Sequence, residues 1–311
     1  MAIPGFPSER CQRRNLAAAL RALETAPVRL YGSAESLFAR ETPAGTLIDS
    51  FGDLPGSEPA TRDAALARIR ALQPPSAKPL EEGDLYLHFA EAANNSYIAD
   101  RYAFMGASTL ENIARGGAQG VAFMNSHRTG GFSSESELPF GRTYCGRYEQ
   151  YLLHEGGQVF DRALVGVYLL RGSKPTGESG PTTDELHRLI EGGVLSDVSV
   201  GIYPGAEGYR RCDICGNDYY GGDCSHYAGS RRNVSPEQQQ SQKERGVPQG
   251  FATYTLEGWT LAEVSGVYDG AVPGAGFAKG YAALQAGLLP ESDAAEWRDA
   301  FAALLQSLTL R

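Results

Sequence analysis

The chain has 311 residues, enough to bury a full hydrophobic core in one large domain or two modest ones. Its hydrophobic content of 42% and charged content of 21% are typical of globular proteins. The net charge of −9 argues against a general nucleic-acid-binding protein, because neutralising phosphates requires a basic surface. No apolar run approaches a membrane span and residues 1–7 lack a signal-peptide pattern. We therefore expect a soluble cytosolic protein that binds neither nucleic acid nor membrane.

The first 80 residues predict two helices and a linker. Apolar residues recur at helical spacing over 11–25, and Pro27 ends that pattern. A second helix is predicted from about residue 58 to residue 72, and the proline-containing stretch 73–79 that follows is typical of a linker. We therefore interpret residues 1–80 as a helical N-terminal extension.

From residue 84 the pattern changes to apolar strands separated by short helices. Strands are predicted at 85–90, 120–127, 163–170, 195–203 and 259–268. A capping box at Ser108–Glu111 predicts a helix that ends at Gly116 and Gly117, and a second box at Thr182–Glu185 predicts a helix through Ile190. This order favours an α+β fold with a mostly antiparallel, closed or nearly closed β-barrel and helices packed outside. Residues 81–275 would form this domain, and 276–311 a helical C-terminal tail.

Residues 207–250 interrupt the strand pattern and contain four metal-type ligands, Cys212, Cys215, Cys224 and His226. Three thiolates and one imidazole fit tetrahedral Zn²⁺, and a full ligand set predicts a structural zinc knuckle. Disulfide pairing is the alternative, disfavoured by the expected compartment and by the odd number of five cysteines. The polar run at 235–243 buries too little apolar surface to fold alone, so we expect half of the insertion to be mobile.

The remaining cysteines, Cys11 and Cys145, are predicted to be inert thiols. A catalytic zinc of the deaminase type requires a His-x-Glu sequence. The chain contains no such sequence, because His154 is followed directly by Glu155 and His226 by Tyr227 and Ala228. The zinc predicted here is therefore structural rather than catalytic.

Three polar residues combine the groups of serine hydrolysis. His127 follows the apolar run 120–126, Ser199 lies within 195–203, and Glu263 lies within 259–268. A serine nucleophile, a histidine base and a carboxylate that orients the histidine are the parts of this chemistry. Their order along the chain, His, Ser, Glu, differs from that of chymotrypsin, subtilisin and the α/β-hydrolases.

Each of these residues also has a structural interpretation. Ser199 can lie on a solvated sheet face, and His127 can cap its strand through a hydrogen bond to the next loop. Glu263 can form a salt bridge with Arg142 or Arg147, because a carboxylate among apolar neighbours requires a partner. The other candidate bases are His88, His154 and His187, of which His187 is the reserve because it precedes the serine strand.

Taken together, the three segments resemble the prohead (procapsid maturation) proteases of tailed bacteriophages, whose fold is related to the herpesvirus assemblins. That family carries a histidine after an apolar strand, a Ser-x-Gly-aromatic strand and a later Leu-x-Glu-Val-Ser-x-Val strand. The matching segments here are His127, Ser-Val-Gly-Ile-Tyr at 199–203 and Leu-Ala-Glu-Val-Ser-Gly-Val at 261–267. The resemblance covers residues 85–275.

The resemblance implies an assemblin-like barrel and a serine endopeptidase with Ser199 as nucleophile, His127 as general base and Glu263 as the residue that orients His127. The implied partners are the scaffold protein, the delta region of the major capsid protein and the chain itself, inside the phage procapsid in the host cytoplasm. Two other functions stay open: a non-catalytic capsid-assembly or scaffold protein that retains the barrel, and a zinc-dependent binding module. The sequence leaves open whether the chain forms a homo-oligomer.

Overall fold

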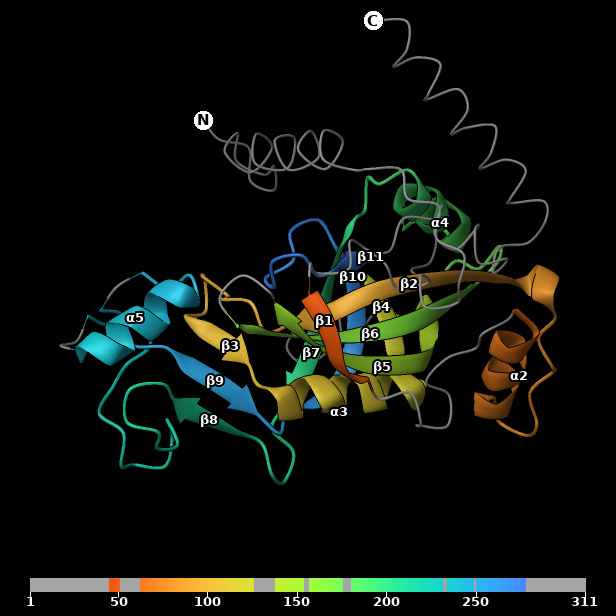
Figure 1. Cartoon of the computed structure of the whole chain (residues 1–311). Coiled ribbons are helices and arrows are strands. Elements are labelled where there is room, and N and C mark those ends of the chain that lie inside the picture. Colours follow the sequence, from red (N-terminus) through yellow and green to blue (C-terminus); the bar gives the residue numbers. More distant parts are fainter. Residues whose placement is uncertain are drawn as a thin grey trace, which may run out of the picture. The chain divides into compact units, whose positions relative to one another are not determined.

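The computed structural model describes residues 45–50, 62–125, 138–153, 157–175, 180–231, 234–248 and 250–277. Its main element is an eight-stranded sheet with the order β1-β5-β4-β10-β7-β11-β2-β6 (Figure 1). Strand β6 also pairs with β5. This additional pairing closes seven of the strands into a barrel, and β1 extends the sheet beyond β5.

The strands of this sheet are β1 (Gly45–Ser50), β2 (Leu85–Asn94), β4 (Ala122–Asn125), β5 (Gly141–Leu153), β6 (Val159–Leu170), β7 (Asp197–Tyr203), β10 (Thr260–Val267) and β11 (Gly276–Phe277). The expected closed barrel with helices is confirmed. The barrel is mixed, however, because β4 runs parallel to β10 while the other described pairs run antiparallel. The expectation of a mostly antiparallel barrel is corrected accordingly. Strands that pair across a long crossover, as β4 and β10 do, are not bound to the antiparallel direction of a hairpin.

The described helices are α2 (Arg62–Leu72), α3 (Ala107–Ala118), α4 (Thr183–Glu191) and α5 (Pro236–Glu244), together with the short 3₁₀ helix η2 (Glu82–Asp84). The capping box predicted for α4 is confirmed, because the Thr182 side chain accepts a hydrogen bond from the Glu185 amide and the Glu185 side chain accepts one from the Thr182 amide. No helix among the described residues has the length and apolar character that crossing a bilayer requires.

Helix α3 differs from its prediction at both ends. It begins after Gly106, and it continues through Gly116 and Gly117 to Ala118. A Cβ on Gly116 would lie 2.7 Å from the Leu261 side chain, and one on Gly117 would lie 2.7 Å from Val165. The two glycines therefore serve close packing of α3 against β10 and β6, and they do not end the helix.

One apolar cluster joins the inward-facing strand residues to α3 and α4. It includes Leu110 and Ile113 from α3, Leu186 and Ile190 from α4, and Val264 from β10. A second cluster packs α2 against the barrel through Ala65, Ile69, Leu85, Phe89 and Tyr144. The expected N-terminal extension is thus joined to the barrel through α2 and through the pairing of β1 with β5. The helix predicted at 11–25 lies outside the described residues. The tail predicted to be helical from residue 276 begins instead as strand β11, which pairs with β2 and β7, and the rest of the tail lies outside the described residues.

A second sheet of three strands has the order β3-β9-β8, formed by β3 (Ala103–Met105), β9 (Tyr254–Glu257) and β8 (Tyr209–Cys212). Figure 1 shows β3, β8 and β9 beside α5. The run 235–243, expected to be mobile, forms most of α5 instead. A capping box between Ser235 and Gln238 begins the helix, and the Gln242 side chain bonds the backbone of Phe251 and Gly250. Polar contacts therefore replace the apolar surface that this helix lacks.

Candidate active site and candidate metal centre

The three strands of the hydrolase motifs are neighbours in the barrel. Strand β10, which carries Glu263, lies between β4 and β7. On one side Ser265 is paired with Ser199, and Glu263 with Gly201. On the other side Glu263 is paired with Ala122 of β4, the strand that leads toward residue 127. Segments far apart in the sequence are thus in register on adjacent strands.

Ser199 and Glu263 lie on the same face of the barrel wall. Directly paired residues of an antiparallel ladder project to the same side of the sheet, so the Ser199–Ser265 and Glu263–Gly201 pairs share a face. Val198 and Val264, one position away, belong to the apolar core. The serine and the carboxylate therefore lie on the face of the wall opposite Val198 and Val264, where Ser199 is partly exposed and Glu263 is buried.

Glu263 is a buried carboxylate, with only 3% of its surface exposed. Ser265 Oγ donates a hydrogen bond of 2.5 Å to Glu263 Oε2. A Cβ on Gly201 would lie 2.3 Å from Glu263 Oε1, so the carboxylate occupies the space that this glycine leaves open. Burial of a charged group requires such donors, because its lost hydration must be replaced. Gly201 and Ser265 together fix the position of the carboxylate.

Two of the histidine candidates, His127 and His154, lie outside the described residues. Strand β4 ends at Asn125, two positions before His127. His187, the reserve candidate, has its Nδ1 atom 3.2 Å from His88 Nε2, and its ring stacks on Tyr86. The contact between His88 of β2 and His187 of α4 thus joins these two elements.

The arginines proposed as alternative partners of Glu263 have other contacts. Arg142 Nη1 donates to the Gly120 carbonyl oxygen at 2.8 Å. Arg147 Nε lies 3.0 Å from Glu149 Oε1 in a buried ion pair. These contacts give both guanidinium groups acceptors of their own, and they do not support a salt bridge to Glu263.

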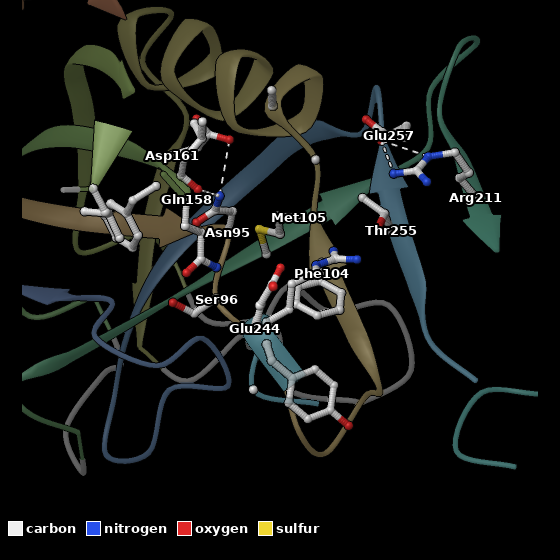
Figure 2. A pocket seen from close by; sticks show the side chains of 18 residues that line it. Asn95, Ser96, Phe104, Met105, Gln158, Asp161, Arg211, Glu244, Thr255 and Glu257 are labelled. Carbon is white, nitrogen blue, oxygen red and sulfur yellow. Dashed lines mark hydrogen bonds and ion pairs between the residues drawn. The ribbon is translucent and has the colours of Figure 1, made fainter. Parts of the chain in front are cut away.

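A cleft of about 600 Å³ lies between the barrel and the second sheet. Figure 2 shows side chains that line it, among them Asn95 and Asp161 from the barrel part and Arg211 and Glu257 from the insertion. Arg211 pairs with Glu257 at 3.2 Å, so the two charges neutralise each other. Neither Ser199 nor Glu263 lines this cleft. This cleft is therefore distinct from the candidate catalytic face.

The four predicted metal ligands converge. Their ligand atoms, from Cys212, Cys215, Cys224 and His226, all lie within 4.8 Å of one another. Cys212 Sγ is 3.6 Å and Cys224 Sγ is 3.8 Å from His226 Nδ1, and the Cys215 and Cys224 sulfurs are 3.7 Å apart. Around a tetrahedral zinc with bonds of about 2.3 Å to sulfur and about 2.0–2.1 Å to nitrogen, ligand atoms lie roughly 3.5–3.8 Å apart. The donor set fits Zn²⁺ in both chemistry and spacing.

The thiols of this cluster differ in their surroundings. Burial raises the pKa of Cys212 to about 11. The exposed Cys215 thiol has a lowered pKa, mainly because the Asn217 amide donates a hydrogen bond to it. Gly216 closes the turn at φ +77°, a conformation that disfavours other residues. A bound cation would stabilise all three thiolates, including that of the buried Cys212.

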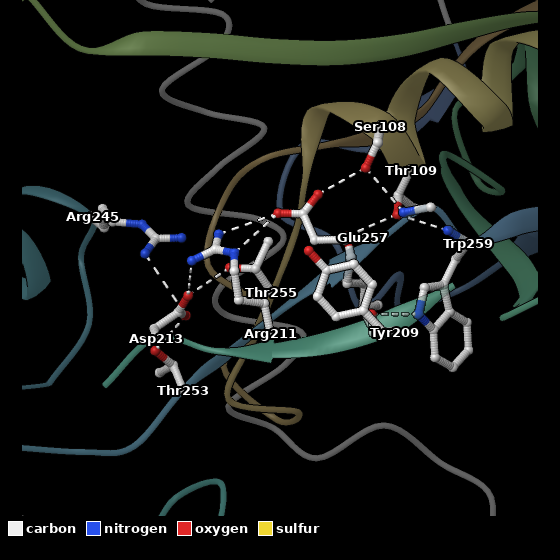
Figure 3. Close-up of polar contacts among 12 residues, drawn as sticks. Ser108, Thr109, Tyr209, Arg211, Asp213, Arg245, Thr253, Thr255, Glu257 and Trp259 are labelled. Carbon is white, nitrogen blue, oxygen red and sulfur yellow. Dashed lines mark hydrogen bonds and ion pairs between the residues drawn. The ribbon is translucent and has the colours of Figure 1, made fainter. Parts of the chain in front are cut away.

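Asp213 fastens the cysteine loop to the second sheet. Its carboxylate accepts hydrogen bonds of 2.8 Å from the Thr253 and Thr255 hydroxyls, and Arg211 lies 3.5 Å away (Figure 3). Arg245 approaches it at 3.8 Å. Burial lowers the pKa of Arg245, an effect that the Asp213 charge opposes. The loop is thus held by Thr255 of β9 and by Thr253 just before that strand.

The second sheet is in turn joined to α3. Glu257 accepts a hydrogen bond of 2.8 Å from Ser108 Oγ, and Ser108 Oγ also accepts one of 3.0 Å from the Gly258 amide. Thr109 Oγ1 donates to the Leu256 carbonyl and accepts from the Trp259 amide (Figure 3). Ser108 therefore joins two elements, and the helix-capping role predicted for it is wrong.

Cys145 is fully buried, and burial raises the pKa of its thiol to about 12. A thiol in this state is neither a nucleophile nor a metal ligand at neutral pH. Burial supports the prediction that Cys145 is inert, while Cys11 lies outside the described residues.

Comparison of the chain with protein-family models, with curated proteins and with solved structures gives no match. The assignment of function therefore depends on the chain's own residues.

Two positioning residues were not identified from the sequence. Ser265 stands two residues after Glu263, and this spacing on a strand places both side chains on one face. Asp213 lies between the first two cysteines, and its hydroxyl partners come from Thr255 of β9 and from Thr253 just before it, whose position beside β8 the sequence does not reveal. The position of Ser265 could therefore have been predicted from its spacing to Glu263, whereas no sequence pattern predicts the contacts of Asp213.

Proposed function

We propose that the chain is a serine endopeptidase of the prohead-protease type. The observation that carries the proposal is the order β4-β10-β7 in the barrel, which sets the strand before His127, the Glu263 strand and the Ser199 strand side by side. Three unrelated motifs would not have to lie on adjacent strands, and Ser199 and Glu263 would not have to share a face of the sheet. The alternative, a capsid-assembly or scaffold protein that retains the barrel, shares this strand order and is distinguished from the protease by its lack of cleavage activity.

In the proposed reaction Ser199 Oγ attacks the carbonyl carbon of a peptide bond while His127 accepts the hydroxyl proton. His127 then donates that proton to the leaving amine, and a water molecule releases the acyl group by the same steps in reverse. Glu263 holds the histidine in the productive tautomer and stabilises its charged form. Ser265 and Gly201 fix the Glu263 carboxylate beside the serine strand.

The proposed substrates are the scaffold protein, the delta region of the major capsid protein and the chain itself, cleaved inside the phage procapsid in the host cytoplasm. This part of the proposal derives from the resemblance of residues 85–275 to prohead proteases. In this proposal an extended peptide reaches Ser199, which is partly exposed, whereas the Glu263 carboxylate fills the space beside Gly201 and stays buried.

The test is the intact mass of the expressed protein beside that of the Ser199→Ala variant. We expect processed fragments from the wild type and an unprocessed Ser199→Ala chain, with a rate lower by about 10⁴–10⁶-fold. The matched control is Ser196→Ala, three residues earlier, whose hydroxyl donates to Asp197. Equal processing of the Ser199→Ala and wild-type chains would exclude Ser199 as nucleophile and favour the assembly protein.

We also propose that Cys212, Cys215, Cys224 and His226 hold one structural Zn²⁺. The close agreement of their spacing with a tetrahedral site supports this role. A protein whose main activity is zinc-dependent binding through the insertion is the second candidate function. It predicts that variants of the cysteines abolish partner binding while Ser199→Ala leaves the function intact.

A further inference from the structure

A second cluster of metal-type side chains lies at the junction of β2 and α4. His88 comes from β2, and His187 and Glu191 come from α4, four positions apart and hence one helical turn apart on the same side. Their ligand atoms all lie within 4.8 Å of one another. Among the described residues this is the one such group besides the cysteine cluster.

Two short distances link the three side chains of this cluster through the two ring nitrogens of His88. His88 Nδ1 lies 3.3 Å from Glu191 Oε1, and His187 Nδ1 lies 3.2 Å from His88 Nε2. Nitrogen and oxygen ligands bound at about 2.0–2.1 Å in a tetrahedral site are separated by roughly 3.3–3.4 Å. His88 faces its two partners with different ring nitrogens, so a bound ion would take one nitrogen, and the partner on the other nitrogen would have to turn toward the ion to become its ligand.

The surroundings hold the three side chains in place. His88 is 3% exposed, and the ring of Phe277 packs edge-on against it at 5.9 Å. The rings of His187 and Tyr86 stack, with their centroids 3.8 Å apart and their planes at 12°. The Arg171 guanidinium lies 4.0 Å from the centroid of the same Tyr86 ring. His187 and Glu191 are partly exposed, which gives an ion and a water ligand a route of entry.

We propose that His88, His187 and Glu191 form a second metal site, which takes a divalent transition metal such as Zn²⁺ or Co²⁺. Two imidazoles and one carboxylate are ligands that these ions accept, and the carboxylate would offset their charge in a largely buried position. The ion fixes α4 to β2. Because α4 leads directly into β7, the site stabilises the segment before Ser199. The proposal stands independently of the proposed protease function.

The site is tested by titrating the chelator-treated full-length chain with Co²⁺. Thiolate ligands give intense charge-transfer absorption, so cobalt in the cysteine cluster is distinguished from cobalt held only by nitrogen and oxygen. We expect about two equivalents in the wild type, one of them without thiolate absorption. His187→Ala and Glu191→Gln should each bind about one equivalent, with the thiolate signal unchanged.

Arg188→Ala is the matched control, because Arg188 is exposed on the same helix and should leave both equivalents in place. Circular dichroism melts confirm that each variant is folded, and Glu191→Gln changes neither size nor shape at its position. A wild type that binds cobalt only with thiolate absorption would overturn the proposal. So would folded His187→Ala and Glu191→Gln chains that both bind as much cobalt as the wild type.

Discussion

The barrel and the insertion between β7 and β10 are stabilised by different interactions. The barrel encloses one apolar cluster, with Phe123, Val198 and Val264 among its fully buried members. In the insertion, Asp213 accepts hydrogen bonds from two threonine hydroxyls and forms an ion pair with Arg211. The Arg210 guanidinium lies within 4.9 Å of the ring centroids of Tyr220 and Trp259. Apolar burial grows with area and needs no partner, whereas polar contacts depend on geometry.

This difference assigns separate tasks to the two regions. The proposed catalytic face is part of the barrel wall, where register is fixed because a one-residue slip would expose the core. The insertion holds its shape through the cysteine cluster and the Asp213 contacts, so removal of a metal should affect it first. The following predictions test this division, from the largest expected effect to the smallest.

The largest effect is expected from the proposed base. His127→Ala should lower the cleavage rate about as much as loss of the nucleophile, by about 10⁶-fold, because the hydroxyl is a poor nucleophile without a base. A cleavage time course measures this. His187→Ala, which changes the α4 cluster, should retain cleavage. The opposite result, an active His127→Ala chain and an inactive His187→Ala chain, would transfer the role to His187.

A smaller effect is expected from the carboxylate. Glu263→Gln keeps the nucleophile and the base and alters only the orientation of the histidine, so we expect a loss of about 10⁴-fold. Glu257→Gln is the matched control in the insertion, since Glu257 contacts Ser108 and Arg211 rather than the catalytic face. If Glu257→Gln impairs cleavage as strongly as Glu263→Gln, the division between barrel and insertion is wrong.

Removal of the metal should act locally. Purified protein is expected to contain about one tightly held Zn²⁺ per chain in the cysteine cluster, and chelation should unfold residues 207–230. The barrel should keep its melting transition, while cleavage slows without being lost because β7 and β10 remain paired. Elemental analysis and thermal melts with and without chelator measure both effects. Collapse of the whole domain would show that the barrel itself requires a metal, in the cysteine cluster or at the α4 cluster of His88, His187 and Glu191.

The smallest effect concerns the thiols. With its pKa raised to about 12, Cys145 stays protonated at pH 8 and should resist alkylation in the folded chain. Cys215, which is exposed, should react once the metal is removed. Peptide mapping after brief alkylation separates the two. Rapid labelling of Cys145 under these conditions would indicate that the barrel opens together with the insertion.

The sequence predicted most of the barrel because its strands are apolar runs. It missed β5, whose segment Gly141–Leu153 is rich in charged and aromatic residues, and Glu149 and Arg147 of this strand are buried as an ion pair. A pattern of alternating hydrophobicity does not reveal paired charges of this kind. The cap of α4 could be predicted because its two partners, Thr182 and Glu185, lie within four residues of each other in the sequence.

The second sheet could not be predicted for a different reason. β9 pairs with β3, which lies far upstream in the chain, and helix α5 depends on contacts of Gln242 with residues 250 and 251. Composition alone therefore indicated mobility where tertiary contacts impose a helix. For the candidate site, the ligands of the cysteine cluster were readable from spacing, whereas the adjacency of β4, β10 and β7 required the sheet order.

The pairing of Tyr203 with Thr260 has a consequence for how this molecule can be altered. The two residues end β7 and begin β10, so the whole insertion is, in topological terms, the loop of a β-hairpin. The entropic cost of closing a loop increases only with the logarithm of its length. Such a connection can be shortened to a tight turn, or exchanged for another module, while Ser199 still faces Ser265 and Glu263 still faces Gly201.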